Sequence, residues 1–175
     1  MIKIGITGGI ASGKSTATEY LNKKKHVFIF NADKESKSHL KSSSNLQKKL
    51  INVFGNQIVI NKKIQINLLA EIAFSNTTNH KILNGIMWPE IYILINQAYK
   101  KAKEEKYKLF IVDAALIFEA NIASFFDKVI LISTNRSNRM KRAIYRKNLS
   151  SEDIQNRISL QMSDKEKKKI GRYYN

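Results

Sequence analysis

The sequence predicts an α/β protein, a parallel β-sheet flanked by helices, and three observations support this fold class. A β-branched segment at residues 2–7 runs into a glycine-rich loop. Residues 109–112 and 129–132 are continuous apolar runs that end at polar residues, which is typical of strands buried within a parallel sheet. Residues from about 34 to 108, before the first of these two runs, form a long stretch with helical periodicity. With 43% hydrophobic residues in 175, the chain can form one packed domain.

In the first part of the chain, the residue pattern predicts a strand, a loop, a helix and a second strand. Residues 2–7 alternate apolar with small or polar side chains. Residues 15–25 can form a helix with Tyr20 among its core-facing side chains. Residues 27–30 form the second strand, which ends at Asn31. This order is that of the first half of a doubly wound α/β sheet.

Residues from about 34 to 108 are expected to form a helical insertion. Apolar side chains recur there at helical spacing, and residues 55–67 predict a loop or short hairpin between helices. Pro89 is expected in the first turn of a helix that runs through Ala98, where its missing N–H costs no hydrogen bond. Trp88, the single tryptophan, either packs in a core or lines a pocket for an adenine or another apolar group.

In the last part of the chain, the residue pattern predicts further helices after the strand at residues 129–132. Residues 136–147 are expected to form an arginine-rich helix, and the region of about 135–160 is expected to be a lid. The cluster that follows contains four lysines and is expected to be a solvated helix face. These lysines are Lys165, Lys167, Lys168 and Lys169.

The chain is strongly basic, with 31 Lys+Arg against 14 Asp+Glu and a formal net charge of +17. It contains 25 lysines, 25 isoleucines and 17 asparagines. All three residue types have A/T-rich codons, so we attribute most of the charge to a biased genome, with some attraction for anionic small molecules. We therefore expect no nucleic-acid partner, although basic chains are also typical of nucleic-acid binding.

Several function classes are excluded by what the sequence lacks. It has no cysteine, which excludes disulfides, thiolate chemistry and cysteine-based zinc sites. No apolar run approaches the ~18–20 residues of a membrane span. The first residues lead directly into the glycine-rich loop, so we expect no cleaved signal peptide and a cytoplasmic location. The three histidines have no ligand spacing, and nothing in the sequence indicates the oligomeric state.

Residues 8–15 carry the clearest chemical signal. They match the pattern G-x-x-x-x-G-K-[ST] between a predicted strand and a predicted helix. Glycines let the backbone N–H groups curl around a phosphate chain, and the helix adds its positive N-terminal end. Lys14 can bridge the outer phosphates and the Ser15 hydroxyl can bind Mg²⁺. The alternative, a turn that only caps a helix, explains less of this pattern.

Two aspartates follow predicted strands, at the sheet edge where ligands bind in open α/β folds. Asp33 could orient or deprotonate an attacking hydroxyl, or it could be the N-cap of a helix beginning at Lys34. Asp113 could bind magnesium, or it could stabilise a turn. Spacing alone leaves both alternatives open for Asp33, and position favours the magnesium role for Asp113.

Three arginines are spaced to share one face of the predicted lid helix. Arg139, Arg142 and Arg146 lie at positions i, i+3 and i+7. Like charges at this spacing repel by a few tenths of a kcal/mol per pair, and an anion between them removes the penalty. Four of the six arginines fall in residues 136–146, which favours a phosphate-binding role over a solvated basic face.

Taken in order, these motifs resemble those of the bacterial dephospho-coenzyme A kinases. The resemblance covers nearly the whole chain, and the motifs that carry it are residues 5–16, Asn31-Ala-Asp33, Leu83-Asn84 with Pro89, Asp113-Ala-Ala-Leu-Ile-Phe-Glu119, Arg142, Arg146, Arg157 and Gln161. It implies a P-loop NTPase-type sheet with an inserted helical substrate subdomain and a mobile lid. It also implies transfer of the ATP γ-phosphoryl group to the ribose 3′-hydroxyl of dephospho-CoA, with Mg²⁺.

The resemblance assigns expected roles to individual residues. Asp33, Lys14 and Arg142 are the expected catalytic residues, and Ser15 and Asp113 the metal ligands. The expected ATP-binding residues are Gly8, Gly9, Ala11, Ser12, Gly13, Lys14, Ser15, Thr16, Arg139, Arg142 and Arg146. The expected substrate-binding residues are Asp33, Trp88, Pro89 and Glu119.

The chain departs from the family pattern mainly on the acceptor side. Asn31, Trp88 and Ala115 stand where the family has Asp, His and Pro. Two other functions therefore stay open from the sequence: another small-molecule kinase of the nucleoside-monophosphate type, or a degenerate nucleotide- or nucleic-acid-binding protein.

Overall fold

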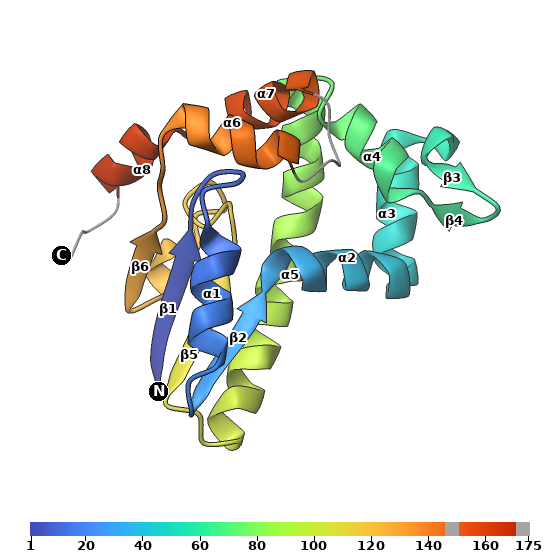
Figure 1. The fold of residues 1–175 in the computed structure, drawn as a ribbon. Helices are drawn as coiled ribbons and strands as arrows, with labels where there is room; N and C mark the ends of the chain where they lie inside the picture. Colours follow the sequence, from blue (N-terminus) through green and yellow to red (C-terminus); the bar gives the residue numbers. More distant parts are fainter. Residues whose placement is uncertain (146–150, 171–175) are drawn as a thin grey trace. The chain divides into compact units, whose positions relative to one another are not determined.

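The computed structural model of the chain describes residues 1–145 and 151–170 (Figure 1). It divides into two compact units. The first consists of Met1–Ala32 and Ile95–Asn175 and contains the sheet; the second, Asp33–Leu94, is mainly helical. Each unit is described by itself below.

The sheet unit is built on four parallel strands. They are β1 (Ile2–Thr7), β2 (Val27–Asn31), β5 (Leu109–Asp113) and β6 (Lys128–Leu131). Their order is β2-β5-β1-β6, and all three pairings are parallel. The predicted parallel sheet is therefore confirmed. The central strand β5 is buried almost throughout, as a continuous apolar run predicts.

The strand β6 differs from its prediction. It begins and ends one residue earlier than the apolar run, and among the described residues it pairs only with β1. Ile130 is 43% exposed, so the expectation of a fully buried strand was wrong here. Four apolar residues in a row indicate a strand, but they do not show whether a neighbour covers both of its edges and faces.

The first helix, α1 (Lys14–Asn22), packs beside β2 and β5. Its buried residue is Thr18, whereas Tyr20 is 62% exposed, which corrects the expected core position of Tyr20. The two residues lie about 200° apart around the helix axis, so burying one exposes the other. Tyr20 instead lies under the ammonium group of Lys24, 4.7 Å from the ring centre.

Three C-terminal helices lie at the edge of the sheet where the strands end. They are α6 (Arg136–Tyr145), α7 (Ser151–Ser159) and α8 (Asp164–Ile170). Figure 1 shows α6 crossing above the loop that follows β1. A small apolar cluster of Ala11, Ala143 and Ile154 holds α6 and α7 to this loop. A short 3₁₀ turn, Ala123–Phe125, precedes β6.

The helical unit has its own hydrophobic core. Its elements are α2 (Ala32–Ser42), α3 (Ser44–Phe54), a 3₁₀ turn (Asn56–Ile58), β3 (Val59–Ile60), β4 (Lys63–Ile64), α4 (Ile66–Ala73) and the first part of α5 (Thr77–Glu104). The core residues are Leu40, Leu46, Leu50, Phe54, Ile58, Leu69 and Met87. β3 and β4 form an antiparallel hairpin, as the sequence allowed for residues 55–67.

The helix α5 is longer than predicted, with 28 residues. Pro89 lies in its interior and not in its first turn, which is a correction to the sequence-based assignment. Proline removes the hydrogen bond to the carbonyl of Gly85, four residues earlier. Buried residues on both sides, Met87 and Ile95, anchor the helix, because most helical stability in proteins comes from tertiary packing. Among the described residues, no helix is long and apolar enough to cross a membrane.

Candidate active site

The loop between β1 and α1 has the geometry of a phosphate-binding loop. Close approaches favour glycine at two positions of the loop, most strictly at Gly8, where the neighbouring atom belongs to the backbone. A Cβ at Gly8, where φ is +153°, would overlap the carbonyl oxygen of Ile132, and a Cβ at Gly9 would overlap the guanidinium of Arg139. No side chain caps the start of α1, where Gly13 adopts a left-handed conformation. The positive end of the helix is therefore directed at the loop.

Lys14 folds across this loop. Its Nζ donates a hydrogen bond to the carbonyl oxygen of Gly8 at 3.0 Å, so the ammonium group lies at the start of the loop. Ser15 and Thr16 are exposed at the beginning of α1. The hydroxyl oxygen of Ser12 is buried, and it makes no hydrogen bond to any described residue. A polar atom in this state is suited to a phosphate oxygen, since burial without a partner is costly.

Two of the three predicted lid arginines contact the loop directly. Arg139 is only 9% exposed, and its Nε donates to the carbonyl oxygen of Ile10 at 3.0 Å. Arg142 approaches the carbonyl oxygen of Ser12 at 3.5 Å. Arg146 lies outside the described residues. The helical spacing thus brings Arg139 and Arg142 to the phosphate loop.

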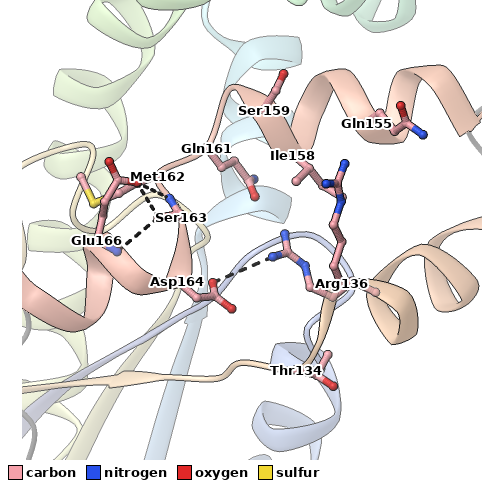
Figure 2. Close-up of a pocket in the computed structure, with 11 residues that line it drawn as sticks. Thr134, Arg136, Gln155, Ile158, Ser159, Gln161, Met162, Ser163, Asp164 and Glu166 are labelled. Carbon is pink, nitrogen blue, oxygen red and sulfur yellow. Dashed lines mark hydrogen bonds and ion pairs between the residues drawn. The ribbon is translucent and has the colours of Figure 1, made fainter.

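A pocket of about 540 Å³ opens beside these contacts (Figure 2). Arg136, Arg139 and Gln161 line it, together with Thr134, Gln155, Ile158, Ser159, Met162, Ser163, Asp164 and Glu166. The side-chain oxygen of Gln161 accepts the N–H of Ile10 at 3.2 Å, while Arg139 binds the carbonyl of the same residue. Gln161, in the turn between α7 and α8, therefore holds the phosphate loop from the pocket side.

Asp113 ends β5 and is 4% exposed. One of its carboxylate oxygens accepts hydrogen bonds from the Thr18 hydroxyl at 3.2 Å and from the Asn31 amide at 3.4 Å. Thr18 lies one turn after Ser15, and its hydroxyl oxygen is also 3.1 Å from the Ser15 carbonyl oxygen. Thr18 therefore contacts both Asp113 and the backbone of Ser15, the two predicted metal ligands. No group of three or more His, Asp or Glu that could hold a metal occurs among the described residues.

Asp33 is exposed in the first turn of α2. The helix begins at Ala32, so Asp33 is not the N-cap of a helix starting at Lys34, as one of the two sequence-based alternatives held. A carboxylate in a first turn still stabilises a helix through the dipole. By covalent geometry alone, its Cα is within about 7.6 Å of the Cα of Asn31.

The predicted acceptor-side residues lie in two places. In the helical unit, Trp88 is half-buried and Pro89 exposed, and Pro89 borders a pocket of about 450 Å³ that Lys49, Val53 and Gly85 also line. In the sheet unit, Glu119 follows β5, and its Oε1 accepts the N–H of Met162 at 3.0 Å.

Glu119 also pairs with Lys167, and this contact corrects a prediction. Lys167 has no exposed surface, and its Nζ lies 2.9 Å from Glu119 Oε1. The other lysines of this cluster are exposed, as predicted. The expectation failed for Lys167 because its partner lies 48 residues away in the chain, where a local charge pattern gives no signal.

In the helical unit, Glu90 is held by Lys49 and His39. Lys49 Nζ lies 2.8 Å from one carboxylate oxygen and His39 Nε2 lies 3.1 Å from the other. Two hydrogen bonds lower the pKa of Glu90 below its usual value of 4.5. The bond from Lys49 has the larger effect, and the bond from His39 has the next largest.

A phosphate loop contacted by two arginines indicates a nucleotide-binding protein. Comparison with known sequences and structures identifies its family. A sequence model of the dephospho-CoA kinases matches residues 2–174. The chain belongs to the dephospho-CoA kinase family. A dephospho-CoA kinase from Fusobacterium nucleatum subsp. nucleatum is 38% identical over 166 residues, which are 94% of this chain and 83% of that protein.

Two solved structures of similar fold extend the comparison. The dephospho-CoA kinase from Campylobacter jejuni has a TM-score of 0.63 at 31% identity, covering 98% of this chain and 85% of that chain. The protein TT1252 from Thermus thermophilus has a TM-score of 0.79 at 26% identity, covering 97% and 85%. The resemblance predicted from the motifs is confirmed, and the protein is a kinase, that is, a phosphotransferase.

Three residues that contact predicted site residues had no assigned role from the sequence. Thr18 and Asn31 orient Asp113, and Lys167 is buried against Glu119. Thr18 carries a weak signal, because a threonine one turn after the phosphate loop faces the sheet. Gln161 belonged to the motif pattern, but only the structure shows its bond to Ile10.

Proposed function

We propose that the protein transfers the γ-phosphoryl group of ATP to the ribose 3′-hydroxyl of dephospho-CoA, giving CoA and ADP. The observation that carries this proposal is the phosphate loop crossed by Lys14 and held by Arg139, in a chain of the dephospho-CoA kinase family. The high net charge of +17 favours polyanionic substrates of this kind.

The sheet unit would bind ATP. Backbone N–H groups of the loop surround the phosphates, and Lys14 leaves the Gly8 carbonyl to hold the β- and γ-phosphates. Arg139, Arg142 and the predicted Arg146 add positive charge where it is needed as the phosphoryl group moves. The remaining predicted phosphate-loop contacts are Gly8, Gly9, Ala11, Ser12, Gly13, Ser15 and Thr16. The pocket beside Gln161 is large enough for the adenosine part of the nucleotide.

The same unit has donors that suit Mg²⁺. Magnesium prefers one or two protein oxygens and completes its shell with phosphates and water. Ser15 offers a hydroxyl and Asp113 a carboxylate, and Thr18 contacts both residues. These two residues would hold the ion, which neutralises charge on the β- and γ-phosphate oxygens when it is bound.

The acceptor would be activated by Asp33. Its carboxylate takes the proton of the ribose 3′-hydroxyl, the freed oxygen forms a bond to the γ-phosphorus, and the bond from that phosphorus to the ADP oxygen breaks. Trp88, Pro89 and Glu119 are the proposed contacts to the rest of dephospho-CoA. Because ATP and CoA precursors are intracellular metabolites, a cytoplasmic location is part of the same proposal.

A coupled ADP-release assay tests this function. We expect release with ATP, Mg²⁺ and dephospho-CoA, and only background release with AMP or without an acceptor. The product should carry its new phosphate at the ribose 3′ position, which ³¹P NMR identifies. Equal turnover with AMP would instead indicate a kinase of the nucleoside-monophosphate type.

A further inference from the structure

Lys167 is a charged side chain that is completely buried in the sheet unit. It lies on a short helix between exposed lysines and yet has no exposed surface. Burying an ammonium group costs several kcal/mol unless it is paired and hydrogen-bonded. A lysine in this position needs a reason beyond the composition of its helix.

The partners of Lys167 belong to the segment that follows Asp113. Its Nζ donates to the carbonyl oxygen of Ala115 at 3.0 Å and pairs with Glu119 Oε1 at 2.9 Å. The other oxygen of Glu119 is buried and has no hydrogen-bond partner within the described part of the chain. The carboxylate therefore depends on Lys167 for its neutralisation.

Two series of hydrogen bonds connect the partners of Lys167 to the phosphate loop. The Ala115 carbonyl oxygen also accepts the hydroxyl of Thr7 at 3.0 Å, and Thr7 is the last residue before the loop. Glu119 Oε1 also accepts the N–H of Met162 at 3.0 Å. The preceding residue of that turn, Gln161, binds the loop through Ile10.

We propose that Lys167 is a positioning residue for nucleotide binding. It fixes Glu119 and Ala115, which in turn hold the 161–162 turn and the start of the phosphate loop, and it touches no substrate itself. This inference rests on the proposed function, because it assumes that the loop binds a nucleotide. It assigns Glu119 a part in shaping the nucleotide side of the site.

The test measures the affinity for ADP by calorimetry, at a temperature below the melting temperature of every variant. Thermal denaturation measures the melting temperature of each variant separately. Lys167→Met should weaken ADP binding about tenfold or more, because the loop whose backbone N–H groups surround the phosphates would no longer be held in position. Lys168→Met removes the same charge from the exposed face of the helix and should leave ADP affinity unchanged.

A paired variant separates positioning from simple stabilisation. Glu119→Leu with Lys167→Met removes both buried charges, and such replacements are often neutral or stabilising. We expect the melting temperature to recover while ADP affinity stays at least tenfold low, because Met162 and Ala115 still lack their partners. Recovery of both together would overturn the proposal.

The remaining outcomes are also decisive. A folded Lys167→Met protein with unchanged ADP affinity overturns the proposal. If this single variant does not fold, the paired variant decides, and it must fold and bind ADP weakly. Wild-type protein that binds ADP but does not phosphorylate dephospho-CoA would refute the proposed function alone, while wild-type protein that binds no ADP would refute both.

Discussion

Replacing Gly9 by alanine tests the contact between the phosphate loop and α6. The added methyl group would occupy the space of the Arg139 guanidinium, which is nine-tenths buried. The guanidinium of Arg139 would have to shift, and we expect this shift to break the hydrogen bond from its Nε to the Ile10 carbonyl oxygen, which is now 3.0 Å long. One alanine methyl would thereby remove an arginine from the loop.

The magnitude follows from the bond that is lost. A hydrogen bond involving a charged group contributes about 1.5–3 kcal/mol. Replacing glycine by alanine returns about 0.4–1 kcal/mol through the unfolded chain. A net loss of roughly 1–2 kcal/mol lowers the melting temperature of a domain of this size by about 2–8 °C. Arg139 is also a proposed phosphate contact; losing that charge-assisted contact, at the same 1.5–3 kcal/mol and about 1.4 kcal/mol for each factor of ten, weakens ADP binding about 10- to 100-fold.

Isothermal calorimetry with ADP and thermal denaturation by circular dichroism measure both effects. Gly85→Ala is the matched control, because its Cβ would meet nothing within 4 Å. That change lies inside α5 and should stabilise the protein by about 0.5–1 kcal/mol with unchanged ADP affinity. If Gly9→Ala binds ADP within twofold of the wild type, Arg139 does not support the loop as described.

Three further predictions concern other parts of the protein. Lys14→Ala should lower turnover ~10²–10³-fold with the fold retained, as circular dichroism can verify; rates within a few-fold of the wild type would refute the assigned ATP site. Asp33→Asn should lower kcat ~10²–10⁴-fold with little change in melting temperature, because only a catalytic role requires the negative charge; a destabilised variant with normal kcat would make Asp33 structural. Glu90→Gln should cost up to about 1 kcal/mol at pH 7, a modest amount because Lys49 is mostly exposed. The pKa of Glu90 is lowered in the folded protein, so its stabilising effect is present above pH 4.5 and is lost as the pH falls through the folded pKa. The melting temperatures of wild type and Glu90→Gln should therefore converge on acidification, and a constant difference down to pH 3 would contradict the ion pair with Lys49 and the hydrogen bond with His39.

Much of the candidate site could be predicted because its signals are local in sequence. The phosphate loop is a contiguous pattern, and its strand and helix flank it directly. Asp113 follows an apolar run, so its place at the end of a buried strand was predictable. Arg139 and Arg142 share a helix face by spacing alone.

Other features could not be predicted, because they depend on residues far apart in the chain. The interior position of Pro89 depends on packing on both sides of α5, which outweighs the loss of one hydrogen bond. The exposure of Ile130 depends on which strands lie beside β6. The periodicity of the sequence shows neither the interior position of Pro89 nor the exposure of Ile130.

The sequence by itself determined the parallel sheet, the phosphate loop and the kinase family, because buried apolar runs and a contiguous glycine-rich motif do not depend on distant partners. Only the tertiary structure decided that Gln161 and Arg139 hold Ile10 from both sides and that Lys167 is buried. The physical reason is desolvation. A charged or polar side chain can leave water only where the fold brings it a partner, and for Lys167 that partner is Glu119, 48 residues earlier in the chain.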